Sequence, residues 1–335
     1  MAKASAVTYI PYMQLASLHP KAARRSSARN RLQTGLLAGG SIFLLVLCAY
    51  IFAGVTGIIW AALFGAISVW LAQRVSPQMV LKLYRARQIQ PEDSPQLAGL
   101  VRKLTARADL PAVPALYYVP SNLMNAFAVG GREESAIAVT DGLLRGLDLR
   151  QLAGVLAHEM SHIRNQDLKV MALADMVSRM TSAMSTVGLL TLLFYAPTIF
   201  SGGAQVPWLG IALLMAAPTI GALLQLALSR TREYEADLDA AQMTGDPEGL
   251  ASALIALERS QGRRWEMMLP GGRVPQPSVL RTHPKTSERV SRLMHLRNTT
   301  GQHIDIPAGS LDLPHGSVPV IPGPRYRLRG MGLWY

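Results

Sequence analysis

Residues 156–165 read LAHEMSHIRN and directly follow the apolar segment QLAGV. A helix through this stretch places His158 and His162 on one face, because positions i and i+4 are neighbours on a helix, so two imidazoles can share one metal ion. Glu159 can reach a water molecule on that ion without binding the ion itself. The pattern H-E-x-x-H on a helix therefore predicts a zinc peptidase, in which zinc lowers the pKa of its bound water to about 7 and Glu159 is the general base.

A catalytic zinc ion of this kind needs a third protein ligand. The segment SRTREYEADLDA, at 229–240, includes the neighbouring carboxylates of Glu233, Glu235 and Asp237. Glu233 and Asp237 share a helix face at i and i+4, whereas Glu235 points elsewhere. One of the two could bind the ion while the other accepts a hydrogen bond from a histidine ring N–H. The spacing does not decide between them, and an exposed acidic face balanced by the neighbouring arginines is the alternative.

The composition indicates a membrane protein. Charged residues make up 16% of the chain and hydrophobic residues 50%, whereas roughly 25% of a soluble domain is charged. An uncharged stretch with Gly54 and Gly57 near its middle predicts a hairpin of two spans, at about 36–53 and 57–73. A second uncharged region, at about 183–228, predicts another hairpin, with a buried helical pair of a soluble protein as the alternative.

The distribution of basic residues predicts how these hairpins are oriented. The formal net charge is +12, which suits an anionic lipid surface or nucleic acid. Basic residues flank the outer ends of both predicted hairpins, at 21–31 and 74–87 for the first and at Arg179 and Arg230 for the second. The positive-inside rule therefore predicts that the N-terminus and the chain after residue 74 are cytoplasmic. No aromatic-basic motif indicates nucleic-acid binding, so the lipid bilayer is the expected partner. The single cysteine, Cys48, excludes a disulfide within one chain.

The region between the hairpins has the composition of an α+β domain. Short strand-like runs lie at 115–119, 125–131 and 135–140, and turn residues follow the last of them. Asp148 and Gln151 then have the spacing of a capping box, which predicts the start of the helix that carries the two histidines.

The strand NAFAVGG has a possible role in substrate binding. An edge strand beside the metal would offer unpaired N–H and C=O groups, to which an extended polypeptide could add as a further strand. Asn125, Ala126, Phe127 and Ala128 are the residues expected to contact substrate in this way. An ordinary core strand is the alternative, since the apolar side chains would serve equally well there.

Taken together, these segments resemble the HtpX-type membrane metalloproteases, relatives of the CaaX prenyl proteases. The resemblance covers about 36–297 and rests on NAFAVGG, VTDGLLRGLDLRQLAGVLAHEMSHIRNQD, SRTREYEAD and THPKTSERVSRL. In that family the third zinc ligand is the glutamate of E-aromatic-x-A-D. The resemblance thus implies one Zn²⁺ per chain held by His158, His162 and Glu233, with Asp237 as the aspartate that supports the ligands.

Two residues of the last matching segment are further catalytic candidates. Arg289 could anchor a carboxylate or stabilise the developing oxyanion, and His283 could approach the open position of the zinc ion. The alternative is a helix start in which Arg289 forms a salt bridge.

The expected fold is α+β, mainly α: a multi-pass membrane protein with a cytoplasmic zincin-like catalytic domain, formed by the H-E-x-x-H helix and a small β-sheet with an edge strand. The expected parts are a basic N-terminal segment at 1–35, a transmembrane hairpin at 36–73, the first part of the catalytic domain at 74–182, a second hairpin at 183–228, the second part of the domain at 229–300, and a tail rich in Pro and Gly at 301–335.

The expected function is that of a zinc-dependent endopeptidase in the cell inner membrane. By resemblance, it cleaves misfolded or membrane proteins, bound in extended form, in quality control during stress. One alternative is a CaaX-type prenyl-protein endopeptidase. The other is a non-catalytic membrane scaffold with a structural zinc, which is disfavoured because such sites are usually closed by cysteines and Cys48 lies in a predicted span. The sequence does not indicate an oligomeric state.

Overall fold

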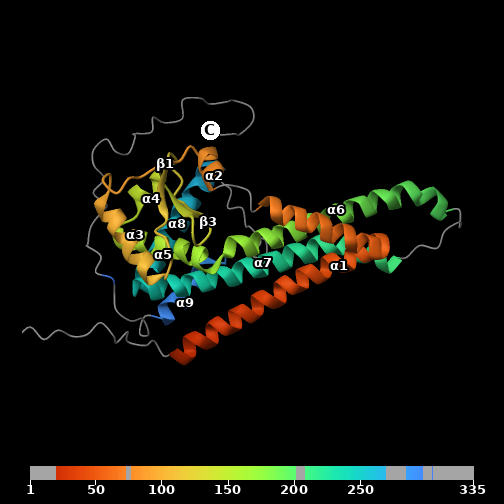
Figure 1. The fold of residues 1–335 in the computed structure, drawn as a ribbon, viewed down its shortest axis with the longest axis horizontal. Coiled ribbons are helices and arrows are strands. Elements are labelled where there is room, and N and C mark those ends of the chain that lie inside the picture. Colours follow the sequence, from red (N-terminus) through yellow and green to blue (C-terminus); the bar gives the residue numbers. More distant parts are fainter. Residues whose placement is uncertain (1–19, 73–76, 201–207, 269–283, 297–303, 305–335) are drawn as a thin grey trace, which may run out of the picture.

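The computed structural model describes residues 20–72, 77–200, 208–268, 284–296 and 304. Three long helices form a rod that extends from one side of a mixed domain of helices and strands (Figure 1). They are α1 (Pro20–Ala72), α6 (Asp167–Phe200) and α7 (Trp208–Thr244). The tail at 305–335 and most of the predicted N-terminal segment lie outside the described residues.

Helix α1 reverses its direction near its middle. Ala53 (φ −149°, ψ 26°) and Gly54 (φ 60°, ψ −145°) leave the helical conformation, and the second of these backbone geometries is one that essentially only glycine adopts. A Cβ atom on Gly57 would lie 2.1 Å from the carbonyl oxygen of Ala49, so the two arms approach where only glycine fits. The arms therefore lie against each other as a hairpin at this turn (Figure 1).

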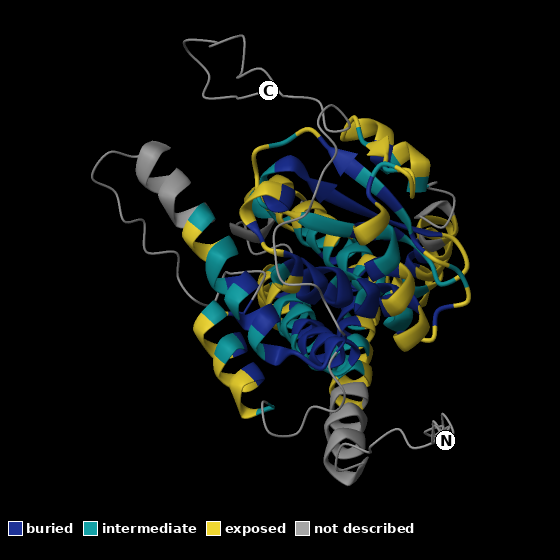
Figure 2. Cartoon of the chain, turned by 90° about the vertical axis from the view of Figure 1, so that its left-hand side faces the viewer, coloured by how far each residue is buried: buried dark blue, intermediate teal, exposed yellow. Residues whose placement is uncertain are grey.

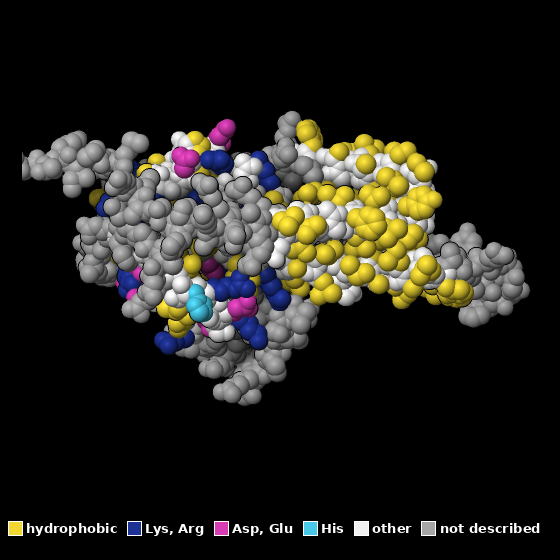
Figure 3. All heavy atoms as spheres, turned by 90° about the horizontal axis from the view of Figure 1, so that it is seen from below, with side chains coloured by type: hydrophobic (Ala, Val, Ile, Leu, Met, Phe, Trp, Pro, Cys, Tyr) yellow, Lys and Arg dark blue, Asp and Glu magenta, His cyan; other side chains and the backbone are white. Residues whose placement is uncertain are grey.

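Three of the described helices are long and apolar enough to cross a membrane, within Leu32–Ser68, Asp167–Phe194 and Trp208–Thr244. The first of these includes the reversal of α1 and so contributes two arms. Large apolar side chains on these helices, such as Trp60 and Phe194, are exposed. Hydrophobic side chains cover the rod, whereas charged ones gather over the domain (Figure 3). The chain is therefore a membrane protein with an attached polar domain.

The domain contains a four-stranded sheet in the order β1-β2-β4-β3. The strands are β1 (Arg87–Gln88), β2 (Ala115–Val119), β3 (Ala126–Gly130) and β4 (Ser135–Thr140). Strand β4 is central and buried along its whole length; it runs parallel to β2 and antiparallel to β3. Among the described residues, strand β3 pairs with β4 alone, in agreement with the predicted edge strand.

Six shorter helices complete the described part of the domain, the centre of which is buried (Figure 2). They are α2 (Pro77–Leu83), α3 (Pro95–Arg107), α4 (Asp141–Gly146), α5 (Leu149–Asn165), α8 (Pro247–Met268) and α9 (Thr286–His295). The predicted capping box at the start of α5 is confirmed, because Asp148 accepts from the Gln151 N–H at 2.7 Å and the Gln151 side chain accepts from the Asp148 N–H at 3.1 Å.

Helix α5 is held in the core on several sides. Leu152, Leu156 and Met160 are fully buried, and a Cβ on Gly154 would lie 2.8 Å from the Cα of Leu250 in α8. Each buried leucine of this kind stabilises the fold by about 1.5–3 kcal/mol. This packing fixes the position of the helix face that carries the two histidines.

Candidate metal centre

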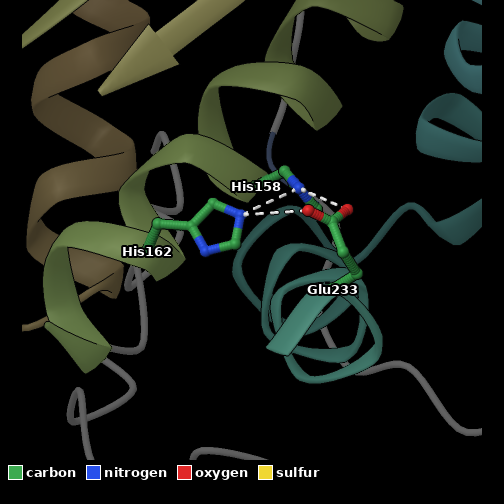
Figure 4. A group of neighbouring side chains, drawn as sticks. All are labelled: His158, His162 and Glu233. Atoms are coloured by element: carbon green, nitrogen blue, oxygen red, sulfur yellow. Dashed lines mark hydrogen bonds and ion pairs between the residues drawn. The ribbon is translucent and has the colours of Figure 1, made fainter. Parts of the chain in front are cut away.

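Three side chains from two helices point toward one another (Figure 4). His158 and His162 come from α5 and Glu233 from α7, and one potential ligand atom of each lies within 4.8 Å of the others. The two Nε2 atoms are 3.2 Å apart. The Glu233 carboxylate oxygens lie 3.6 Å from Nε2 of His158 and 4.0 Å from Nε2 of His162.

This donor set fits a zinc ion. Two nitrogens bound tetrahedrally at the usual zinc–nitrogen length would be about 3.3 Å apart, close to the separation of the two Nε2 atoms. Two imidazoles and one carboxylate are also a ligand combination typical of catalytic zinc, with a fourth position left for water. Residues 158, 162 and 233 could therefore hold the ion with little movement.

An aspartate lies at the Nδ1 atom of His158, and a buried arginine in turn holds that aspartate. Its Nδ1 lies 3.1 Å from the Asp237 carboxylate. Arg289 donates two hydrogen bonds to the same carboxylate, at 2.7 and 2.6 Å, and its third nitrogen lies 3.2 Å from a Glu233 oxygen. These buried groups thus orient both a histidine and the glutamate of the cluster.

His162 has a matching support that the sequence analysis missed. Its Nδ1 lies 2.7 Å from a carboxylate oxygen of Asp167, the first residue of α6. Arg232 pairs with Asp167 and also with Glu235, and all three are buried. Gln166, with φ 55°, turns the chain between α5 and α6, which lets an acid five positions after His162 fold back onto it. The sequence did offer one signal for this contact, an acidic residue close after the end of the helix that carries the two histidines.

The Glu159 carboxylate accepts a hydrogen bond from the backbone N–H of Ala128 in β3, at 3.0 Å. Burial raises the pKa of Glu159, against the opposing effect of the two histidines and this N–H. For His162, burial lowers the pKa, but the hydrogen bond with Asp167 and the nearby carboxylates outweigh it and raise the pKa to about 9. A metal ion binding at Nε2 would therefore displace a proton from the site.

Comparison with known proteins assigns the family. The sequence model of "Peptidase family M48" matches residues 91–297. Proteins named "Protease HtpX homolog" from Burkholderia ambifaria (strain MC40-6), Paraburkholderia phytofirmans and Burkholderia mallei (strain SAVP1) are each 33% identical over 286 residues, which is 81% of this chain and 98% of theirs. The chain belongs to peptidase family M48.

The resemblance to HtpX-type membrane metalloproteases is thereby confirmed, and this M48 peptidase is a membrane metalloendopeptidase. Its fold is also similar to that in the "Crystal Structure of S. mikatae Ste24p". The TM-score is 0.51 at 21% identity, and the match covers 80% of this chain and 66% of that longer one. This likeness supports the predicted fold class, a mainly helical membrane protein with a small sheet.

Strand β3 of the M48 peptidase runs beside the metal centre. The Ala128 N–H points away from β4 and toward Glu159, so the Ala126 N–H, two residues earlier, points the same way. The Phe127 side chain points to the opposite face of the sheet from that of Ala128. Its ring contacts the ring of Tyr84, with 5.0 Å between the two ring centroids. Asn125 precedes the strand and is exposed, and its carbonyl oxygen accepts from the Thr140 N–H at 3.0 Å.

The two remaining catalytic candidates are His283 and Arg289. His283 lies outside the described residues. Arg289 is buried, and its contacts with Asp237 and Glu233 are those of the salt-bridge alternative. Glu235 turns toward Arg232 and away from the histidines, in agreement with the helical spacing.

Proposed function

We propose that this M48 centre binds one zinc ion through His158, His162 and Glu233 and cleaves internal peptide bonds of polypeptides, with Glu159 as general base. The observation that carries the proposal is the pair of Nε2 atoms 3.2 Å apart, beside a carboxylate, with an aspartate at each Nδ1. An aspartate that accepts from Nδ1–H leaves the Nε2 lone pair for a cation. Two Nε2 atoms that face each other at this distance are well placed to bind one cation between them.

When bound, the ion supplies an acidified water molecule and polarises the scissile carbonyl group. Glu159 takes the proton of the attacking water and returns it to the leaving amine nitrogen. The raised pKa of the buried carboxylate suits this role, because it brings proton affinity closer to neutral pH. The Ala128 N–H holds the carboxylate in position for both transfers.

Arg289 and Arg232 position the ligands in this proposal. Each pairs with an aspartate that lies at the Nδ1 atom of one histidine, and that aspartate orients the histidine ring. Arg289 also contacts Glu233 directly. In this arrangement buried charges orient all three ligands before the metal binds. The conformational free energy that is lost when the ligand side chains are ordered is therefore smaller.

For substrate binding we propose β-augmentation along Asn125, Ala126, Phe127 and Ala128. The outer edge of β3 presents main-chain groups on the same side as Glu159, so an extended polypeptide added there, beside the Ala128 N–H that donates to Glu159, would run past the metal centre. Main-chain recognition places few demands on side chains. It therefore suits a peptidase whose substrates are misfolded or membrane proteins of varied sequence, in quality control during stress.

We further propose that the catalytic residues and the N-terminus face the cytoplasm from the inner membrane. The division is a hairpin at 36–73, domain parts at 74–182 and 229–300, and a second hairpin at 183–228. Basic residues at the domain end of each predicted span support this orientation. Helices α6 and α7 each run unbroken from the rod into the metal centre, so the site lies close to the bilayer surface. The alternative of a CaaX-type prenyl-protein endopeptidase has less support, because relatives matched over 98% of their length are HtpX homologues.

The test is the metal content and proteolysis of the full chain purified in detergent, wild type beside Glu159→Gln. The variant should keep one zinc per chain and lose at least about 100-fold in the cleavage rate of casein and in self-cleavage, because it loses the proton acceptor. Glu258→Gln, a change in α8 away from the centre, is the control and should behave as wild type. A Glu159→Gln protein that still cuts at the wild-type rate would overturn the mechanism, and a wild type without zinc would overturn the ligand set.

A further inference from the structure

Helix α2 packs on the face of the sheet opposite to α5. Leu81 is its buried residue, and the residues that surround it are Val119, Val129, Ala136 and Ala138. Successive strand residues point to opposite faces of a sheet, and Ala128, next to Val129, packs into the core that contains α5. One side of α2 is therefore fixed to the sheet, and the other side faces outward.

The outward side of α2 is apolar. At 100° per residue, Met79 and Leu83 lie together on the side opposite to Leu81. Their side chains are 69% and 81% exposed, and Tyr84, directly after the helix, is also exposed. We call Met79, Leu83 and Tyr84 the α2 patch. Large apolar side chains gathered on the surface of a polar domain are typical of a contact with protein or membrane.

The charged residues beside the α2 patch are basic. Lys82, Arg85 and Arg87 are exposed, and the sequence contains no acidic residue before Glu92. Apolar side chains flanked by Lys and Arg are typical of helices that lie in the membrane interface. The apolar groups enter the boundary between headgroups and acyl chains, and the cations attract anionic headgroups. The patch is therefore complementary to an anionic lipid surface.

The connection between α1 and α2 keeps the patch close to such a surface. Helix α2 begins at Pro77, five residues after Ala72, where α1 ends beyond its membrane-spanning segment. Five residues cover at most about 19 Å, because consecutive Cα atoms are 3.8 Å apart. Helix α2 lies on the side of the domain next to this end of α1 (Figure 1). The patch is thus near the bilayer surface from which α1 emerges.

We propose that the α2 patch inserts into the headgroup region of the bilayer that α1 spans, with Lys82 and Arg85 at anionic headgroups. Lipid is the occupant because the patch follows a lipid-exposed span directly in the chain and because the charges of this segment have one sign. The contact also holds β3 near the bilayer, since the Tyr84 ring lies against that of Phe127. This inference depends on the membrane insertion of α1 and not on the zinc chemistry.

The test is the quenching of a fluorescent label by nitroxide lipids in vesicles that contain the full chain. Cys48→Ala removes the single cysteine, and Glu159→Gln suppresses self-cleavage. Leu83→Cys then carries a nitrobenzoxadiazole label on the α2 patch. The vesicles contain phosphatidylglycerol, phosphatidylcholine and a lipid with a nitroxide high on its acyl chain.

Ala106→Cys carries the same label as a matched control on α3. Ala106 is exposed, and the neighbouring Arg107 donates to the carbonyl oxygen of Met243 at 2.9 Å, near the end of α7 that is remote from the membrane. The label at 83 should lose more than about half of its fluorescence and the label at 106 very little, because interfacial side chains lie roughly 5–10 Å into the headgroup boundary.

The basic residues are tested in the labelled Leu83→Cys chain. Lys82→Glu with Arg85→Glu should lower the quenching by at least about half, because each cation near an anionic leaflet adds to the attraction. Arg102→Glu with Lys103→Glu, on the exposed side of α3, is the control and should leave the quenching unchanged.

Four results would overturn the proposal. They are no quenching at 83, equal quenching at 83 and 106, a charge reversal at 82 and 85 that changes no more than its control, and a blue-shifted emission at 83 without quenching by lipid. The last result would show that protein, and not lipid, covers the α2 patch.

Discussion

The two halves of helix α7 lie in opposite environments. Its first half presents apolar side chains outward, with Leu209 86% and Leu223 46% exposed. Its second half buries Glu233, Asp237 and Asp239, each less than 10% exposed, against α5. A large continuous apolar surface is more stable against lipid than against water, whereas buried carboxylates need partners such as Arg289. One continuous helix thus connects the membrane to the metal centre. Contact with lipid stabilises its first half, and pairing of buried charges stabilises its second half.

The largest effect is expected for a change of Glu233 itself. Glu233→Ala should weaken zinc binding by more than about 100-fold and should abolish proteolysis. This loss is larger than the loss of about 10–100-fold that is typical when a residue hydrogen-bonded to a metal ligand is changed. Metal analysis after dialysis against a chelator measures the loss. Glu258→Ala, a change of an exposed glutamate in α8 away from the centre, is the control and should retain zinc. Equal metal loss in both variants would contradict the assignment of Glu233 as a ligand.

Helix α9 carries one buried and one exposed arginine, and the loss of each should have a different effect on stability. Arg289→Ala should lower the free energy of unfolding by about 3–5 kcal/mol, because it leaves two buried carboxylates without their cation. Arg292 pairs with Glu288 at the surface and lies over the Tyr234 ring, so Arg292→Ala should cost about 1 kcal/mol. Denaturant titration in mild detergent measures both, and similar costs would refute the contrast.

The support behind His162 is tested by Asp167→Asn. This variant should weaken zinc binding or activity by about 10–100-fold while the fold is retained, because the amide no longer holds the ring as the carboxylate does. Asp148→Asn is the control, since asparagine caps a helix as well as aspartate does. If both variants bind zinc like the wild type, Asp167 has no part in orienting His162.

The smallest effect is expected on the lipid-facing side of the rod. Leu223→Ala should change stability in a bilayer-like detergent by less than about 1 kcal/mol, because detergent and lipid tails are as apolar as leucine. Leu156→Ala in the domain core should cost about 2–5 kcal/mol, since it leaves a cavity. A comparable loss at Leu223 would show that this side of α7 packs against protein.

Much of the local structure could be predicted from short-range patterns. The capping box at Asp148 and the strand runs followed from the spacing and type of residues, whereas the pattern of β3 fitted an edge strand and a core strand equally well. These features depend on neighbouring residues, for which spacing along the chain sets spacing in space. Bends between elements were harder, because Gly54 and Gly57 show where a turn is possible but not how closely the two arms approach.

The sequence by itself determined that two histidines share one helix face and that a glutamate stands next to them. Only the tertiary structure decided what surrounds them. Asp167 reaches His162 through a left-handed turn at Gln166, and Arg289 reaches Asp237 across 52 positions of sequence. The spacing left Glu233 and Asp237 equivalent, whereas the packing of α7 against α5 puts one at the Nε2 atoms and the other at an Nδ1 atom. The partner of a buried charge is determined by the residues that the tertiary structure brings near it. The spacing of residues along the sequence does not indicate which residue that partner is.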